Sequence, residues 1–186
     1  LWTAARTEIA RMGGAHVAAI AVKAWFQKIL HSSGFEKLQN IVMLEWTSRL
    51  LDAHPLSHGI HIRPMLADDM PAVAETDAAA FESLWHNSHD ALEKAYTQSL
   101  CATVAEADAG VIGYQLSTGN PLGAHLARLA VRPEAQGRGI GSALVNDLIL
   151  RLRPRNLARL SVNTQADTAA SLALYPKIVF VHTGEQ

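Results

Sequence analysis

The sequence predicts an α/β fold in which helices flank a mixed central sheet. From Gly59 onward, the patterns follow the order strand, two helices, three strands, helix, strand, helix, strand. With 49% apolar residues in a chain of 186, there is enough apolar material for one well-buried domain and part of a second. The apolar stretches are short and interrupted by charges, so we expect a soluble, cytoplasmic protein that does not contact a membrane.

The first half of this region contains a short strand, two helices and a hairpin. Residues 61–66 are typical of a short strand, and residues 68–81 are typical of a helix with acids in its first turn. A second helix begins at His89. Residues 101–106 and 110–117 are strand-like and are separated by turn residues, which predicts an antiparallel hairpin.

The second half is arranged around one glycine-rich connection. Residues 124–133 form a near-continuous apolar run, the pattern of a strand buried on both faces, and Pro133 helps to end it. Apolar side chains then recur at helical spacing from Ile140 to Leu152, and Pro154 closes this helix. The remaining predicted elements are a strand at 158–164, a helix at 168–175 and a last strand at 179–184.

Charge is unevenly distributed along the chain. The formal net charge of -1 gives no reason to expect nucleic acid or an anionic membrane as a partner. Between residues 128 and 159, however, seven arginines stand against two acids, which gives this segment a local charge of about +5. Such a segment suits an anionic ligand.

The connection between the apolar strand and the helix has glycines at 137, 139 and 141, so three of its positions carry no side chain. Backbone N–H groups there can point at an anion, and the helix dipole and Arg138 both favour negative charge. The glycines alone fit either a phosphate cradle or a plain turn. No Gly-Lys-Ser/Thr tripeptide follows, and Ser142 breaks the dinucleotide pattern G-x-G-x-x-G. Neither nucleotide-binding class therefore fits.

The strand LARLAVRP followed by EAQGRGIGSALV resembles the pyrophosphate loop of the GCN5-related N-acetyltransferase (GNAT) family. The family signature, Gln/Arg-x-x-Gly-x-Gly/Ala, is met by Gln136, Gly139 and Gly141, and the resemblance extends from Gly59 to the end. It implies the GNAT fold, and it implies acetyl-coenzyme A as co-substrate with its diphosphate on this loop. The cofactor-binding residues that it implies are Leu129, Ala130, Val131, Gln136, Gly137, Arg138, Gly139, Ile140, Gly141, Ser142 and Asn163.

The resemblance also implies a mechanism. In this family the strand before the loop splays from its neighbour, so the backbone of Leu129 to Val131 would pair with the pantetheine arm. An N–H near Leu129 would polarise the thioester carbonyl, and the acceptor amine would attack it directly. Tyr175 matches the tyrosine that protonates the departing thiolate, although it could also be a packed aromatic residue with a solvated hydroxyl.

Three positions depart from the family pattern around this tyrosine. Pro176 stands where the helix should continue, Val179 replaces a glycine, and Thr168 replaces an asparagine. These departures could displace Tyr175. They motivate an alternative function, a coenzyme A-binding regulatory or interaction module with impaired catalysis, and a second one, a scaffold whose glycine loop is only a turn.

The general base is left open by the sequence. Five side chains could face an acceptor pocket: Glu82, His86, His89, Glu106 and His125. The position before Leu129, often acidic in relatives, is Arg128, which could instead receive an acidic acceptor. Water could also remove the amine proton, so that no base is required.

The first residues resemble the closing part of another GNAT domain. Residues 1–12 would be the tail of a helix, 16–22 a strand, 26–30 a short helix, and two short strands would follow Gly34 and Phe35. We therefore predict a partial, degenerate copy at 1–48, a linker at 49–58 and the acetyltransferase domain at 59–186. Relatives usually have one more strand at the C-terminus, and we expect the strand around Ile41 to Glu45 to cover that open edge.

The predicted function is N-acetylation of a primary amine on an unidentified acceptor, either a small molecule such as a metabolite or antibiotic, or a peptide or protein. A homodimer is left open, and no metal site is expected, since the linker histidines His54, His58 and His61 are typical of solvated side chains.

Overall fold

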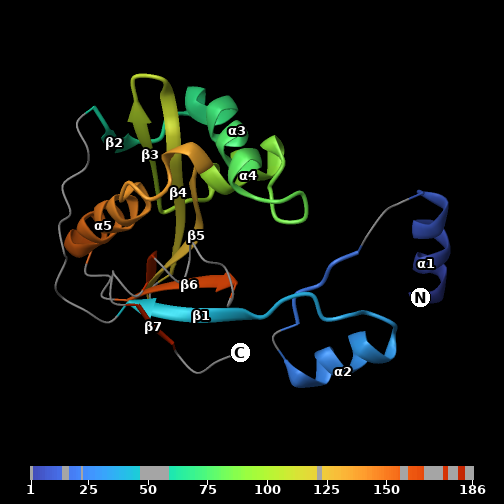
Figure 1. Ribbon diagram of the computed structural model, residues 1–186. Coiled ribbons are helices and arrows are strands. Elements are labelled where there is room, and N and C mark those ends of the chain that lie inside the picture. Colours follow the sequence, from blue (N-terminus) through green and yellow to red (C-terminus); the bar gives the residue numbers. More distant parts are fainter. Residues whose placement is uncertain are drawn as a thin grey trace. The chain divides into compact units, whose positions relative to one another are not determined.

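The computed structural model describes residues 2–13, 17–21, 23–46, 59–120, 123–155, 159–165, 174–175 and 180–182. The chain divides into two compact units, residues 1–40 and residues 41–185. Strand β1 (Ile41–Trp46), which the sequence analysis assigned to the N-terminal segment, belongs to the sheet of the second unit (Figure 1). The origin of residues 1–40 as a degenerate copy stays a prediction.

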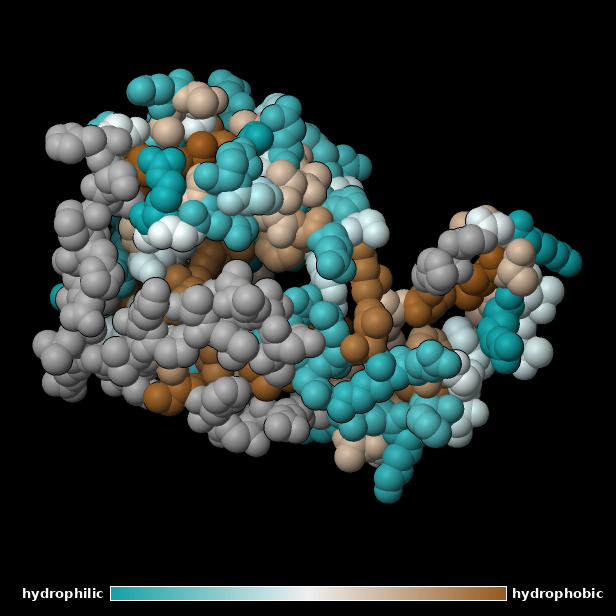
Figure 2. All heavy atoms as spheres, in the orientation of Figure 1, coloured by the Kyte–Doolittle hydropathy of each residue, from teal (hydrophilic) through white to brown (hydrophobic). Residues whose placement is uncertain are grey.

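The first unit contains helices α1 (Trp2–Arg11) and α2 (Ala24–Ser32), as the sequence predicted. The Trp2 indole donates to the Ser33 carbonyl at 3.0 Å and stacks on Phe35 with ring centroids 4.9 Å apart. None of its described side chains is buried, and Figure 2 shows hydrophobic side chains on its surface.

Two strands that the sequence predicted for the first unit do not form. Residues 17–21 have no regular structure, and of the two strands expected after Phe35 only β1 forms. A strand needs a neighbour to accept and donate its backbone hydrogen bonds. The described part of this unit offers residues 17–21 no such neighbour, because β1 pairs within the second unit.

The second unit is built on a seven-stranded mixed sheet with the order β2-β3-β4-β5-β6-β1-β7. Besides β1, its strands are β2 (His61–Pro64), β3 (Cys101–Ala107), β4 (Gly110–Asn120), β5 (Gly123–Val131), β6 (Leu160–Gln165) and β7 (Phe180–His182). All neighbours pair antiparallel except β5 and β6, which are parallel. The predicted α/β fold with a mixed central sheet is confirmed.

Helices cover both faces of the β2 to β5 part of this sheet (Figure 1). Helix α5 (Ile140–Leu152) packs on one face through the apolar side chains that recur at helical spacing, and it ends where the sequence predicted. Helices α3 (Met70–Ala80) and α4 (His89–Thr97) pack on the other face. Of the helix predicted at 168–175, only Leu174 and Tyr175 are described, and both are helical. No helix in the described part of the chain has the length and apolarity that a membrane crossing requires.

Strand β1 lies inside the sheet, between β6 and β7. Leu44 is paired with Val162 on one side and with His182 on the other. The expected pairing with the last strand is therefore confirmed, but the expected position at the sheet edge is wrong, because β7 lies outside β1. Val42, Leu44 and Trp46 are each at most 8% exposed. Alternating apolar side chains of this kind are typical of a strand with one face on the core.

Candidate functional site

The glycine loop forms a concentrated set of free backbone donors. Gly137 and Gly139 have φ angles of 75° and 81°, and Gly139 is the N-cap of α5. A Cβ atom at either glycine would meet no atom within 4 Å, so the backbone is open to a ligand. From Gly137 to Ser142, no N–H group donates to another described residue; the first such bond is from Ala143 to the Gly139 carbonyl, at 3.0 Å. Such an arrangement favours an anion.

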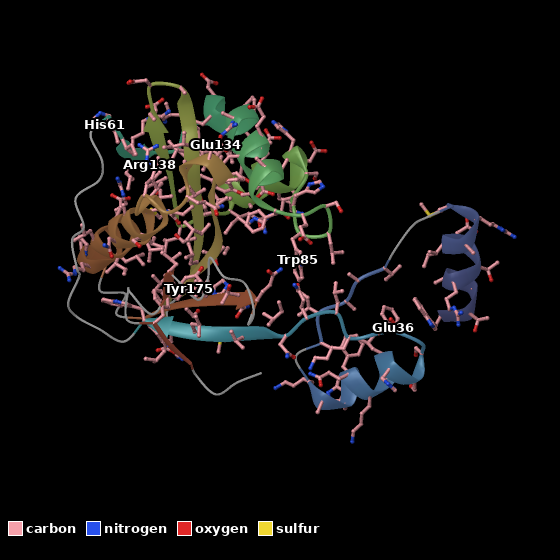
Figure 3. All side chains as sticks on the ribbon, in the orientation of Figure 1. Glu36, His61, Trp85, Glu134, Arg138 and Tyr175 are labelled. Atoms are coloured by element: carbon pink, nitrogen blue, oxygen red, sulfur yellow. The ribbon has the colours of Figure 1, made fainter. Side chains whose placement is uncertain are left out.

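The side chains of this loop differ in how they are engaged. The Gln136 amide donates to the Val131 carbonyl at 3.0 Å, which ties the loop to the end of β5. Arg138 is exposed at the N-terminal end of α5 and makes no contact with a described acid (Figure 3). The Ile140 side chain is buried in the core, so only its backbone N–H group is available to an anion.

Strands β5 and β6 pair over a short segment and then separate. Their parallel pairing covers Ala124 to Leu126, while β5 continues to Val131. The β4–β5 register shifts between Leu126 and Arg128, so Ala127 forms a bulge at the point of separation. Beyond Leu126, the β5 edge that faces β6 pairs with no described strand. Leu129, Ala130 and Val131 lie on this edge, where the predicted splay placed them.

Tyr175 is packed mainly by other aromatic and aliphatic side chains. It is 6% exposed, and its ring meets that of Phe180 edge-on with centroids 5.3 Å apart. Leu174 contacts the first turn of α5, since a Cβ atom at Gly141 would lie 3.6 Å from its methyl groups. Burial raises the pKa of Tyr175 to about 12, so its hydroxyl is protonated at neutral pH. The departures at Thr168, Pro176 and Val179 lie outside the described residues.

Arg128 is held by a buried acid that sequence reasoning missed. Its Nε and Nη2 atoms donate to the two carboxylate oxygens of Asp77 at 2.8 Å each, and Nη2 also donates to the Trp85 carbonyl at 2.6 Å. Its guanidinium lies 3.6 Å from the centroid of the Phe81 ring. The hypothesis that Arg128 receives an acidic acceptor is therefore wrong, because Asp77 already neutralises it. The two residues are 51 positions apart, and no sequence signal links them.

Asp77 is the centre of this buried network. It is fully buried, and it accepts further hydrogen bonds from the Tyr114 hydroxyl and, at 2.7 Å, from the Asn87 N–H. Burial alone would raise the pKa of Asp77, but the hydrogen bonds from Arg128, Tyr114 and Asn87 outweigh it and leave the pKa lowered. Burial and the nearby Asp77 carboxylate raise the pKa of Tyr114. The network joins α3, the loop after it, β4 and β5.

The positive charge expected between residues 128 and 159 is largely neutralised. Within the described part of the chain, four of the seven arginines are seen to pair with acids: Arg128 with Asp77, Arg132 with Glu75, Arg151 with Asp147 and Arg159 with Glu45. Three of these acids come from outside the segment, where a count along the sequence could not include them. The local charge of about +5 therefore overstates the positive charge of this segment, although Arg138 on the loop is exposed.

The five candidate bases lie in different environments. Glu106 is held by Arg63, whose Nε and Nη2 atoms donate to it at 2.8 and 3.0 Å. Three others are exposed on α4 or on the loop before it: Glu82, His86 and His89. His125 lies on β5 in the short segment that pairs with β6, and its Nδ1 atom is 2.9 Å from the Ser161 hydroxyl. Burial lowers the pKa of His125, so it is neutral at pH 7.

Asn163 follows Ser161 by two residues on β6 and is exposed. Alternation along the strand places both side chains on the face that carries His125. Among the described residues, no group of three or more histidine, cysteine, aspartate or glutamate side chains is arranged to hold a metal ion. His54 and His58 lie outside the described residues.

Residues 70–179 match the model of the Acetyltransferase (GNAT) family. The chain belongs to this family. The chain is 27% identical over 119 residues to a Bacillus subtilis protein named as a candidate ribosomal protein bS18-alanine N-acetyltransferase, and the match covers 62% of this chain and 77% of that one.

Two solved structures show the same fold. A GCN5-related N-acetyltransferase from Sphaerobacter thermophilus has a TM-score of 0.70 at 18% identity, with 86% of this chain and 53% of that chain covered. This chain thus spans about half the length of that protein. An N-acetyltransferase from Thermoplasma acidophilum, solved in complex with coenzyme A, has a TM-score of 0.58 at 17% identity and covers 63% of this chain and 87% of its own.

Proposed function

We propose that this GNAT acetyltransferase moves an acetyl group from acetyl-coenzyme A to a primary amine by direct attack within a ternary complex. The observation that carries the proposal is that two stretches of backbone with hydrogen-bonding groups available to a ligand lie next to each other. The N–H groups of residues 137–142, which donate to no described residue, adjoin the edge of β5 that pairs with no described strand. A long ligand with an anionic part and an amide-rich arm fits this arrangement, and acetyl-coenzyme A is such a ligand.

The donor is bound mainly by backbone. The N–H groups from Gly137 to Ser142 hold the diphosphate at the positive end of the α5 dipole, with Arg138 beside them. Leu129, Ala130 and Val131 pair with the pantetheine arm, and Gln136 supports them by holding the Val131 carbonyl. Asn163 borders the opening from β6 and contacts the donor there.

The chemistry needs few side chains. An N–H group near Leu129 stabilises the developing negative charge on the thioester oxygen. Tyr175 gives its proton to the departing thiolate, for which its protonated state at neutral pH is suited. Among the candidate bases His125 is the best placed, because it is neutral and lies on β5 next to the point of separation. It accepts the proton of the attacking amine.

The first acceptor to test is the α-amine of a peptide that begins with alanine. The support is the name of the Bacillus subtilis relative, which covers 62% of this chain. The test incubates the full chain with acetyl-coenzyme A and either this peptide, the same peptide with a blocked N-terminus, or a panel of small amines, and it records the acetylated product by mass. Acetylation of the free peptide alone supports a protein acceptor. Acetylation of the small amines alone overturns the peptide proposal, and no product with any amine contradicts the transferase reaction on these acceptors.

A further inference from the structure

Strand β1 lies outside the family match, which covers residues 70–179, yet it is an internal strand of the sheet, next to the edge strand β7. Its six residues all pair with β6, and three of them also pair with β7. Strand β7 has no other partner among the described strands. The part of the chain that carries Tyr175 and Phe180 therefore packs against a strand from the other end of the sequence.

A cross-strand pair and one aromatic contact connect this strand to Tyr175. Trp46, the last residue of β1, is paired directly with Phe180 of β7. Phe180 in turn meets Tyr175 edge-on, with ring centroids 5.3 Å apart and an interplanar angle of 66°. All three rings belong to one buried cluster, and they are 8%, 7% and 6% exposed in this order.

We propose that Trp46 is a positioning residue for Tyr175, which it holds in place through Phe180. The inference rests on the proposed role of Tyr175 as the proton donor to the thiolate. It extends the catalytic unit beyond the family match to a strand that begins at Ile41.

Packing is the means by which Tyr175 is held. Its hydroxyl makes no hydrogen bond to a described residue, so its direction depends on the contacts of its ring. The described members of its buried cluster, and the half-buried side chains packed against that cluster, are aliphatic or aromatic, apart from Cys101. Burial, not a charged neighbour, raises the pKa of Tyr175. Loss of the Trp46 ring would remove the support behind Phe180 and admit water to the cluster.

The kinetic test compares Trp46→Ala, Trp46→Phe and Val42→Ala in the full chain, with acetyl-coenzyme A and the alanine-starting peptide. Val42 is the matched control, because it is buried on the same face of the same strand but has no partner on β7. We expect Trp46→Ala to lower kcat by about 10-fold or more while the affinity for acetyl-coenzyme A is unchanged. Trp46→Phe should restore most of the rate, and Val42→Ala should retain it.

A second readout does not depend on the acceptor. Tyrosinate absorbance is measured as the pH is raised to about 11. Each variant is measured both as it is and with Tyr175→Phe added, and the difference between the two curves reports the ionisation of Tyr175 alone. The parent chain should show almost no ionisation of Tyr175 in this range, whereas Trp46→Ala should shift its titration toward the ordinary pKa of about 10. If Trp46→Ala does not fold, Phe180→Leu is the variant for both readouts.

The outcomes separate the two proposals. A folded Trp46→Ala protein with the parent kcat and titration overturns the inference, and so does an equal loss of kcat in Val42→Ala. If Tyr175→Phe leaves kcat unchanged, the proposed acid role fails, and with it the positioning role in catalysis. If Tyr175 titrates in Trp46→Ala as it does in the parent chain, while Tyr175→Phe lowers kcat, the positioning inference fails and the acid role of Tyr175 stands.

Discussion

Replacing Gly139 with glutamate should separate the binding role of the loop from its folding role. The φ angle of 81° lies in the left-handed region, so any side chain there costs about 1 to 3 kcal/mol of stability. Gly110, at the turn between β3 and β4, has a φ of 102° and equally open surroundings. Gly110→Glu is therefore the matched control, with similar strain outside residues 137–142.

The expected loss of binding follows from charge. A carboxylate at about 5 Å from a phosphate, at effective dielectric constants of about 20 to 80, is repelled by about 1 to 3 kcal/mol. This corresponds to about 5- to 150-fold weaker binding of acetyl-coenzyme A. Calorimetric titration measures the affinities, and thermal unfolding measures the stabilities. Both variants should lose similar stability, and only Gly139→Glu should lose affinity. A folded Gly139→Glu variant that binds as tightly as the parent would refute the cradle.

Three further predictions concern side chains of the site and its support. Tyr175→Phe should lower turnover of acetyl-coenzyme A with almost no change in its calorimetric affinity, because the hydroxyl acts after binding; a parallel loss of affinity would argue for a structural role. Asp77→Asn should lower the free energy of unfolding in urea by about 3 to 5 kcal/mol, since it leaves the Arg128 guanidinium without its buried counter-charge; a loss below about 1 kcal/mol would contradict this. Because burial holds the pKa of His125 below its unfolded value of about 6.5, protonation favours the unfolded chain, so stability should fall as the pH drops below about 6.5. His125→Gln should weaken that dependence, and an unchanged pH profile would show that His125 does not contribute.

The elements that the sequence predicted well are those that depend on neighbours along the chain. Helix α5 follows from apolar spacing between Ile140 and Leu152, and the hairpin of β3 and β4 follows from the turn between two strand-like runs. The left-handed glycines at 137 and 139 were likewise visible as residue types. These local signals placed the loop and the α/β fold.

The features that the sequence did not reveal depend on contacts between distant segments. An apolar run predicts a strand at 16–22, but a strand forms only where a partner strand exists, and residues 17–21 have none among the described residues. The pairing of β1 with β6, which places β1 inside the sheet, joins residues more than a hundred positions apart. The neutralisation of Arg128 and Arg159 depends equally on distant acids, Asp77 and Glu45.

The most direct test of the central claim is calorimetric titration of the full chain with acetyl-coenzyme A and, separately, with S-acetylpantetheine, which lacks the diphosphate. The N–H groups of residues 137–142, which have no acceptor in the described part of the chain, predict that acetyl-coenzyme A binds and that S-acetylpantetheine binds far more weakly. Equal affinities for the two ligands, or no binding of acetyl-coenzyme A to a folded sample, would contradict the assignment of the loop as the diphosphate cradle.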